Sequence, residues 1–367
     1  MRIAITGASG NVGTALLRAL PDAEVVAVAR RPPPAGREPY ARARWVACDI
    51  GDPSARPTLA AAFDGADAVV HLAWAVHPRR TDPPLERTNR IGTDHVLGAV
   101  ADSGVAHLTV ASSVAAYSPA PRWIRVDEQQ PRDGVPGGAY SLGKAALERR
   151  LDAFAGERPA VGLARIRPCG IAQSDAAAEL GDWLLGPWLP RSPVGRSWLP
   201  VPLWPRLRLQ LVHAEDVAAA IRAILVRRAT GAFDLAAEPV LTAPELTEIF
   251  GGFRLPVPRP VLSAAAFAGW RIGLLPLHPS WLRLADRACL VRAERARREL
   301  DWRPAHSAVD VATELAAALR ARTSGGSPAL HPEPMRFRPG CPTHQDQRPG
   351  IARDECRSPM PATGAGG

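Results

Sequence analysis

The stretch Arg2-Ile3-Ala4-Ile5-Thr6-Gly7-Ala8-Ser9-Gly10-Asn11-Val12-Gly13 decides the fold. Its short apolar run predicts a buried strand, and three glycines spaced three apart predict a tight turn that opens a helix at residues 11–20. Such glycines let the backbone approach a pyrophosphate, while the helix N-terminus offers amide donors and a positive dipole end. We therefore predict a dinucleotide-binding loop that uses Gly7, Ser9, Gly10, Asn11, Val12 and Gly13.

The alternation of apolar runs and helical patterns continues through residue 235. Further strands are predicted at residues 24–29, 44–47, 68–72, 108–111, 161–166 and 232–235. Segments with helical spacing lie at residues 88–101, 140–154 and 217–226. Strands that alternate with helices are typical of parallel βαβ units. The predicted fold class is α/β: a Rossmann-type doubly wound parallel sheet with a smaller C-terminal substrate-binding lobe.

The rest of the chain predicts the domain organisation. We expect a nucleotide-binding domain at residues 1–168 that resumes at about 209–237, and a substrate-binding lobe at 169–208 and 238–322. The lobe has helical patterns at 281–300 and 309–319. From Thr323 onward the sequence lacks periodicity, so residues 323–367 are predicted to be a disordered tail rich in proline and glycine.

Tryptophan is concentrated in one part of the predicted lobe. Glycine and proline interrupt residues 167–207, which also contain Trp183, Trp188, Trp198 and Trp204. Because indoles stack on sugar and aromatic faces, we expect this segment to cap the substrate. For any single one of these tryptophans, packing in a core or a dimer interface is slightly favoured over direct substrate contact.

The composition limits the possible classes of function. The chain has 367 residues and a formal charge of +9, but its arginines are scattered and no nucleic-acid-binding motif is present. It shows no signal-peptide core and no long apolar span. Five cysteines without a Cys-x-x-Cys pair fit a reducing compartment, and Cys341, His344 and Cys356 match no closed zinc site. We expect a cytoplasmic protein with a small-molecule substrate, no nucleic-acid or membrane partner, and no metal.

One basic residue stands out. Lys144 is the only lysine of the chain, since the other 44 of its 45 Lys and Arg residues are arginine. In Tyr140-Ser-Leu-Gly-Lys144 the phenol and the ammonium share one face of the predicted helix. An ammonium is a compact charge with a tunable pKa, and beside a phenol it stabilises the phenolate. The pair predicts a tyrosine that exchanges a proton near neutral pH. The alternative is an ordinary exposed lysine.

The end of the second predicted strand bears on the choice of cofactor. An acidic residue there binds the ribose hydroxyls of NAD, whereas arginine accommodates the 2′-phosphate of NADP. Here the strand Glu24-Val-Val-Ala-Val-Ala29 is followed by Arg30 and Arg31. We therefore favour NADP(H) over NAD(H), with the alternative that both arginines are plain loop charges.

Further motifs follow in a fixed order along the chain. They are Cys48-Asp49-Ile50, His71-Leu72-Ala73-Trp74, Asn89-Arg-Ile-Gly-Thr93, Ser112-Ser113-Val-Ala-Ala-Tyr117, Arg167-Pro168 and Val212-His213-Ala-Glu-Asp216-Val217. Together with the glycine loop and Tyr140-x-x-x-Lys144, this series resembles the short-chain dehydrogenase/reductase superfamily, specifically its extended branch of NAD(P)-dependent epimerases and dehydratases. The only two asparagines, Asn11 and Asn89, both fall within matched motifs.

The resemblance implies an NAD(P)-dependent oxidoreductase that transfers hydride to or from a carbonyl or secondary alcohol. It makes Tyr140 the general acid/base and Ser113 the hydroxyl that bonds the same oxygen. Lys144 would lower the Tyr140 pKa and hold the nicotinamide ribose, and Asn89 would orient the group. Its further cofactor contacts are Arg30, Arg31, Asp49, Ile50, Leu72, Ala73, Trp74, Tyr140, Lys144 and Pro168. Relatives often dimerise through the helices that correspond to 88–101 and 140–154, which implies a possible homodimer.

Two departures from the family pattern concern the substrate. The chain reads Arg167-Pro-Cys-Gly-Ile-Ala-Gln173 where nucleotide-sugar members usually read Arg-Pro-x-x-Val-Tyr-Gly-Pro, and Trp74 replaces a small residue. The alternative of a sugar or nucleotide-sugar epimerase or dehydratase remains open, with dehydration ranked lower because no acidic residue adjoins Ser113. A non-catalytic NADP-sensing protein is the further alternative, and the presence of both Tyr140 and Lys144 argues against it.

Overall fold

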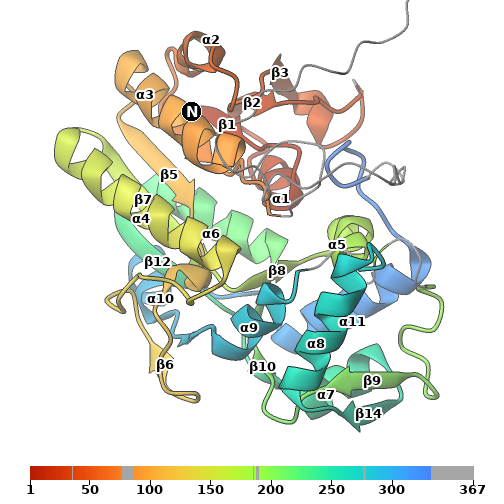
Figure 1. Cartoon of the computed structure of the whole chain (residues 1–367). Helices are drawn as coiled ribbons and strands as arrows, with labels where there is room; N and C mark the ends of the chain where they lie inside the picture. The colour runs from red at the N-terminus through yellow and green to blue at the C-terminus, as the bar shows by residue number, and fades with distance from the viewer. Residues whose placement is uncertain (35, 77–85, 185, 187–189, 276–277, 332–367) are drawn as a thin grey trace, which may run out of the picture. The chain divides into compact units, whose positions relative to one another are not determined.

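The computed structural model describes residues 1–34, 36–76, 86–184, 186, 190–275 and 278–331. A seven-stranded parallel sheet lies at its centre (Figure 1). Its strands are β1 (Arg2–Thr6), β2 (Glu24–Ala29), β3 (Ala43–Ala47), β4 (Ala68–His71), β5 (His107–Ala111), β7 (Gly162–Pro168) and β12 (Gly231–Leu235). Their order across the sheet is β12-β7-β5-β4-β1-β2-β3.

The direction in which strands are added reverses at β1. This strand pairs with both β2 and β4, with Ile5 opposite Ala27 on one side and Val70 on the other. From β1 the chain builds outward through β2 and β3, and then in the other direction through β4, β5, β7 and β12. In open α/β sheets, ligands bind in the crevice at such a switch point, outside the carboxyl ends of the strands.

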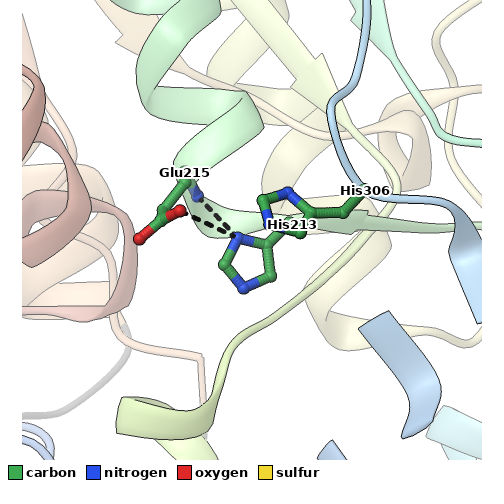
Figure 2. A group of neighbouring side chains, drawn as sticks. All are labelled: His213, Glu215 and His306. Atoms are coloured by element: carbon green, nitrogen blue, oxygen red, sulfur yellow. Dashed lines mark hydrogen bonds and ion pairs between the residues drawn. The ribbon is translucent and has the colours of Figure 1, made fainter. Parts of the chain in front are cut away.

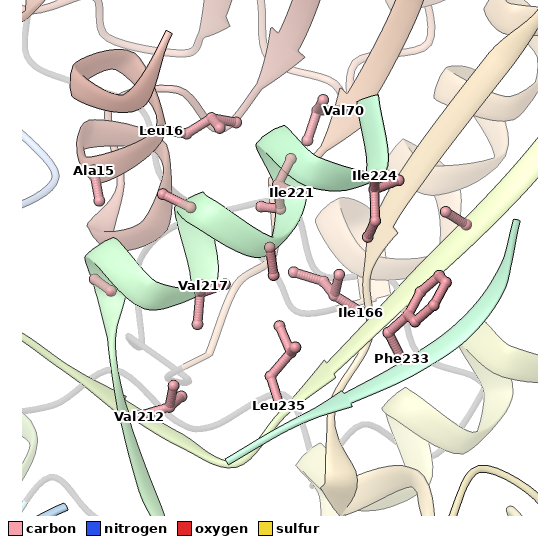
Figure 3. Packing of buried hydrophobic residues seen from close by; sticks show 14 of the residues in the cluster. Ala15, Leu16, Val70, Ile166, Val212, Val217, Ile221, Ile224, Phe233 and Leu235 are labelled. Atoms are coloured by element: carbon pink, nitrogen blue, oxygen red, sulfur yellow. The ribbon is translucent and has the colours of Figure 1, made fainter. Parts of the chain in front are cut away.

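Helices cover both faces of the sheet. One face carries α1 (Asn11–Ala19), α6 (Ala214–Arg227) and α10 (Glu294–Leu300), whose apolar side chains share one core with the strands; Figure 3 shows Leu16, Ile221 and Phe233 in it. The other face carries α2 (Ala55–Phe63), α3 (Thr93–Ser103) and α4 (Ala139–Glu157). Because both faces are covered, the strands are nearly continuous apolar runs, which explains why they could be predicted. The predicted fold class is confirmed.

The smaller lobe contains helices and short strand pairs. Its helices are α5 (Ala177–Leu184), α7 (Ala243–Phe250), α8 (Arg259–Arg271), α9 (Ser280–Arg287) and α11 (Ala308–Ala321). The paired strands are β8 (Gly170–Ala172) with β11 (Leu211–His213), β9 (Pro200–Leu203) with β14 (Phe253–Pro256), β10 (Arg208–Leu209) with β13 (Leu241–Thr242), and β6 (Arg125–Val126) with β15 (Leu290–Val291). Trp204, Leu246 and Leu315 belong to a separate core of this lobe.

Two predicted helices differ from those observed. The helix expected at residues 88–101 begins with a π-helical turn, η2 (Arg87–Gly92), before α3. The continuous helix expected at 281–300 is wrong: α9 ends at Arg287, β15 pairs with β6, and α10 follows. Pairing with a strand far away in sequence overrides the local helical pattern there. The remaining short turns are η1 (Tyr40–Arg42), η3 (Val114–Ala116) and η4 (Ser174–Ala176).

The start of the predicted tail packs against the rest of the chain. Ser327 Oγ donates to the Ser9 carbonyl oxygen at 2.6 Å, Gly325 N–H donates to Asp175 O at 2.8 Å, and Leu330 is buried. A disordered tail from Thr323 onward is therefore wrong for residues 323–331, because local composition does not reveal these distant contacts. Residues 332–367 lie outside the described part of the chain.

The expected division into two domains remains a prediction. Residues 293–302, which were assigned to the lobe, contribute Ala296, Leu300 and Trp302 to the core of the sheet. No helix within the described ranges is long and apolar enough to cross a membrane.

Candidate active site

The glycine loop lies at the switch point of the sheet. Gly7 has a φ of +74°, and a Cβ added to it would lie 2.6 Å from the Ala73 backbone nitrogen. The position therefore requires glycine both for its conformation and for the close approach of the chain leaving β4. Leu72 donates its N–H to the last residue of β1 at 3.0 Å. Val12 packs against the core and Gly13 is buried within α1.

The same loop fits the diphosphate of a dinucleotide. Among the described residues, a Cβ added to Gly10 would meet only the Gly7 carbonyl oxygen, at 3.4 Å, so the backbone there is open to a ligand. α1 begins without a side-chain cap at Gly10, which leaves first-turn N–H groups available to an anion. Ser9 is buried, and Gln173 Nε2 holds Asn11 by donating to its O and Oδ1, each at 2.9 Å.

The predicted contacts on the adenosine side lie at the ends of β2 and β3. Arg30 and Arg31 directly follow β2 and are exposed. Asp49 follows β3 and accepts a hydrogen bond from Arg87 Nη2 at 2.8 Å, which makes it part of an ion pair. Ile50 is buried in the core of that face. These four residues thus line the edge of the sheet on the β2–β3 side of the loop.

Asn89 contacts the backbone that leaves β4. Its Oδ1 accepts from Ala75 N at 2.7 Å, and its Nδ2 donates to Ala75 O at 2.9 Å. This pair of bonds fixes the segment that carries Trp74. Asn89 lies in the π-helical turn η2, a distortion that is frequent at functional sites. Orientation of the catalytic side chains by Asn89 stays a prediction.

Ser113, Tyr140 and Lys144 come together beside the carboxyl end of β5. Ser113 follows this strand and caps η3, and its Oγ also lies 3.4 Å from the Pro168 carbonyl oxygen. Tyr140 and Lys144 lie in the first two turns of α4, which packs against η3. The Ser113 hydroxyl lies close enough to the Tyr140 phenol to oppose the rise of its pKa. Lys144 Nζ donates to the Ala111 carbonyl oxygen at 2.8 Å.

Burial controls the pKa values of both titratable groups. It raises the pKa of Tyr140, against the opposing effect of the Ser113 hydrogen bond. It lowers the pKa of Lys144 to about 7, against the opposing charge of Glu148. The net shift of the Tyr140 pKa is therefore upward and not downward as predicted, because desolvation of the phenolate dominates. The ammonium lies 6.0 Å from the centre of the Tyr140 ring.

A buried ionic cluster adjoins the site. Glu148 is fully buried and accepts hydrogen bonds from Arg167 Nε and Nη2 at 2.8 and 2.9 Å. Arg167 Nη1 also donates to the Tyr117 hydroxyl, which donates to Asp234 Oδ1 at 2.7 Å. Despite burial, the bonds and charge of Arg167 lower the pKa of Glu148 to about 2, whereas burial raises that of Asp234. Tyr117 therefore serves packing and hydrogen bonding within this cluster.

Two tryptophans contact the catalytic side chains. The Trp74 ring lies under Lys144, whose Nζ is 3.7 Å from the ring centroid. Trp281, at the start of α9, packs against Tyr140 with ring centroids 5.0 Å apart and planes tilted by 31°. Tyr140 and Trp281 adjoin a small apolar cluster with Ala115, Val135 and Leu284 at its centre. The lobe thus places the Trp281 ring directly against Tyr140, the predicted proton donor.

The tryptophan-rich segment has other roles where it is described. Trp204 is buried and its Nε1 donates to Asp286 Oδ1 at 3.0 Å, whereas Trp198 is 63% exposed. Trp183 is partly buried, and Trp188 lies outside the described residues. The sequence analysis missed Trp281, because only the fold of the lobe brings α9 to α4.

These features define a Rossmann-type, dinucleotide-binding protein. The family model "NAD dependent epimerase/dehydratase family" matches residues 3–235. The chain therefore belongs to this family, which confirms the predicted resemblance.

Curated relatives match a part of the chain. A protein of Stigmatella aurantiaca named 4-hydroxy-2-methyl-3-oxo-4-farnesyl-3,4-dihydroquinoline-1-oxide ketoreductase is 30% identical over 151 residues, which are 41% of this chain and 44% of the relative. The uncharacterized protein 052L of Frog virus 3 is 31% identical over 131 residues, 34% of this chain and 37% of the relative. The matches thus span less than half of these two relatives.

Solved structures show the same fold. A UDP-glucose-4-epimerase from Stenotrophomonas maltophila with bound NAD and formylated UDP-arabinopyranose has a TM-score of 0.65 at 20% identity, covering 88% of this chain and 98% of that one. MoeE5 in complex with UDP-glucuronic acid and NAD has a TM-score of 0.62 at 19% identity, covering 88% and 100%. At this identity the likeness concerns the fold.

Proposed function

We propose that this protein is an NAD(P)-dependent oxidoreductase that reduces the carbonyl group of an apolar, aromatic substrate or oxidises the corresponding secondary alcohol. The observation that carries this proposal is the contact of Trp281 with Tyr140. Together with Trp74 beside Lys144, it gives the site indole faces suited to flat apolar rings. The name of the Stigmatella aurantiaca relative, a quinoline-oxide ketoreductase, agrees with such a substrate.

The catalytic side chains suit proton transfer to a carbonyl oxygen. When bound, the nicotinamide supplies the hydride. Tyr140 donates its phenolic proton to the substrate oxygen as the hydroxyl forms, and its raised pKa keeps that proton in place until then. Ser113, which lies beside Tyr140, donates to the same oxygen as negative charge develops. Protonated Lys144, one helical turn away, stabilises the phenolate that remains.

A panel assay separates reduction from epimerisation. We expect the purified protein to consume NADPH with acetophenone and 2-acetylnaphthalene, and Tyr140→Phe to abolish turnover while NADPH binding persists. UDP-glucose serves as the comparison substrate. Its conversion to UDP-galactose without net cofactor consumption, with the ketones inert, would establish the epimerase alternative. NADPH binding without turnover of either class would support the cofactor-sensing alternative.

The proposed cofactor preference is NADP(H) over NAD(H). Arg30 and Arg31 follow β2 and are exposed, in the position from which a guanidinium reaches a 2′-phosphate. We expect Arg30→Ala to raise the dissociation constant for NADPH about ten-fold or more and to change that for NADH little. Equal changes for both cofactors in fluorescence titrations would contradict the 2′-phosphate assignment.

The setting and assembly are also proposals. Cys48, Cys169 and Cys289 are free thiols, which suits a reducing, cytoplasmic compartment. By analogy with relatives, the protein forms a homodimer through α3 and α4. Native mass spectrometry of the purified protein reports both its stoichiometry and the co-purifying nucleotide, and a monomer mass at micromolar concentration would exclude the dimer.

A further inference from the structure

A cluster of metal-ligand side chains lies away from the catalytic residues, at the junction of the sheet and the lobe. His213 ends β11 and caps α6, Glu215 lies in the first turn of α6, and His306 precedes α11 (Figure 2). One ligand atom from each residue lies within 4.8 Å of the others. The imidazoles pack against each other, with ring centroids 4.1 Å apart.

Each imidazole has a carboxylate on one ring nitrogen. His306 Nδ1 is 3.1 Å from Asp216 Oδ2, and His213 Nε2 is 3.2 Å from Glu314 Oε2. Ligating histidines almost always engage a carboxylate or carbonyl through the nitrogen that does not bind metal. The arrangement leaves Nε2 of His306 and Nδ1 of His213 as ligand atoms. The latter accepts one long bond, from Glu215 N at 3.3 Å, and lies 3.9 Å from Glu215 Oε2.

The surroundings favour a cation. His213 is 4% exposed, and its Nε2 makes no hydrogen bond of good geometry within the described residues despite the nearby Glu314. A metal on Nδ1 would polarise the Nε2 proton toward that carboxylate. Glu215, Asp216 and Glu314 place three carboxyl groups around the imidazoles, a setting that suits a cation. Two imidazoles and one carboxylate are a ligand set that zinc accepts.

We propose that His213, Glu215 and His306 bind a zinc ion, with Asp216 and Glu314 orienting the two imidazoles. The sequence analysis expected no metal and considered only Cys341, His344 and Cys356 as ligands. His213 and His306 are far apart in the chain, so local patterns do not reveal this cluster. The site links α6 to α11. Glu314 Oε1 also accepts a hydrogen bond from Ser174 N at 2.6 Å. The preceding residue, Gln173, donates to Asn11 of the glycine loop. The metal thus fastens the lobe to the part of the sheet that carries the cofactor loop.

The test is zinc binding by the full chain, purified without a histidine tag and stripped with a chelator. Isothermal titration with zinc chloride is expected to show one site per chain, with a melting temperature raised by about 3–4 °C at a 100-fold excess over Kd. Glu215→Gln is the main variant, because this side chain is 52% exposed and its removal leaves the core intact. It should weaken binding about 10- to 100-fold, and His306→Gln should do the same or more.

A matched control addresses the cysteines. The double variant Cys341→Ser/Cys356→Ser removes two thiols and should bind zinc like the wild type. Cobalt bound to the wild type should show no thiolate charge-transfer band. Failure of the wild type to bind zinc would overturn the proposal. So would wild-type affinity in both Glu215→Gln and His306→Gln, or loss of binding in the cysteine variant alone.

Discussion

Two buried cationic side chains near α4, Lys144 and Arg167, have different surroundings. Lys144 and Arg167 are each 2% exposed. Arg167 donates to the Glu148 carboxylate, the Tyr117 hydroxyl and the Glu128 carbonyl oxygen, and its pKa is raised. Lys144 donates to Ala111 O and lies against the face of Trp74, and its pKa is lowered to about 7. One charge is held permanently by its partners, and the other can change its protonation state near neutral pH.

The largest expected effect is the loss of stability on replacing Arg167, the cation that is paired with Glu148. Arg167→Met leaves Glu148 with weaker compensation inside the protein, so we expect a loss of about 3–5 kcal/mol in the free energy of unfolding, measured by urea denaturation. Arg150→Met is the matched control, since Arg150 forms partly exposed ion pairs with Asp94 and Glu157. It should cost about 0–1 kcal/mol. Equal losses in the two variants would show that the buried Glu148–Arg167 pair contributes no more to stability than a partly exposed ion pair.

Replacement of Lys144 is expected to have the opposite effect to replacement of Arg167: activity falls, whereas stability does not. Lys144→Met should lower kcat/KM for ketone reduction about 100-fold or more, because the Tyr140 phenolate loses its neighbouring charge. The free energy of unfolding at pH 7 should rise, since relief of the desolvated ammonium outweighs the lost bond to Ala111. Lys144→Arg should not restore activity, because the planar guanidinium differs in shape and does not change its charge. Full activity in Lys144→Met would remove this residue from the mechanism.

The pH dependence of stability gives a further test of the lowered Lys144 pKa. The pKa of Lys144 falls from 10.5 to about 7 on folding, so the unfolded chain binds more protons between these values. The unfavourable contribution of Lys144 is complete below pH 7 and disappears as the pH rises through this window. Relative to Lys144→Met, the wild type should gain up to about 1.4 kcal/mol per pH unit between pH 7.5 and 9. Parallel profiles of the two proteins would contradict the lowered pKa.

The smallest expected effect concerns Trp281, which packs against Tyr140. Trp281→Ala should raise KM for 2-acetylnaphthalene about three- to ten-fold, because an aromatic contact is lost. Trp198→Ala changes an exposed indole and should leave KM unchanged. If Trp281→Ala instead lowers kcat with KM constant, Trp281 positions Tyr140 and does not contact the substrate.

The sequence predicted what local patterns determine. The strands of the sheet are buried on both faces, so their apolar runs were visible, and the glycine loop followed the first of them. Tyr140 and Lys144 were found from their spacing, and Ser113 from the resemblance to the family. Local patterns failed where partners lie far apart: β15 pairs with β6, Trp281 reaches Tyr140, and His306 meets His213. These contacts arise from the packing of the lobe, which leaves no periodic signal in the chain.

The bond from Ser327 to Ser9 joins residues 318 positions apart and has a consequence for biosynthesis. The glycine loop leaves the ribosome 318 residues before the hydroxyl that bonds its carbonyl oxygen. At about 5–20 residues per second, the loop waits roughly 15 to 60 s for this partner. During that interval the nascent sheet has a glycine loop without this hydrogen bond, so the loop reaches its complete form only after Ser327 has emerged.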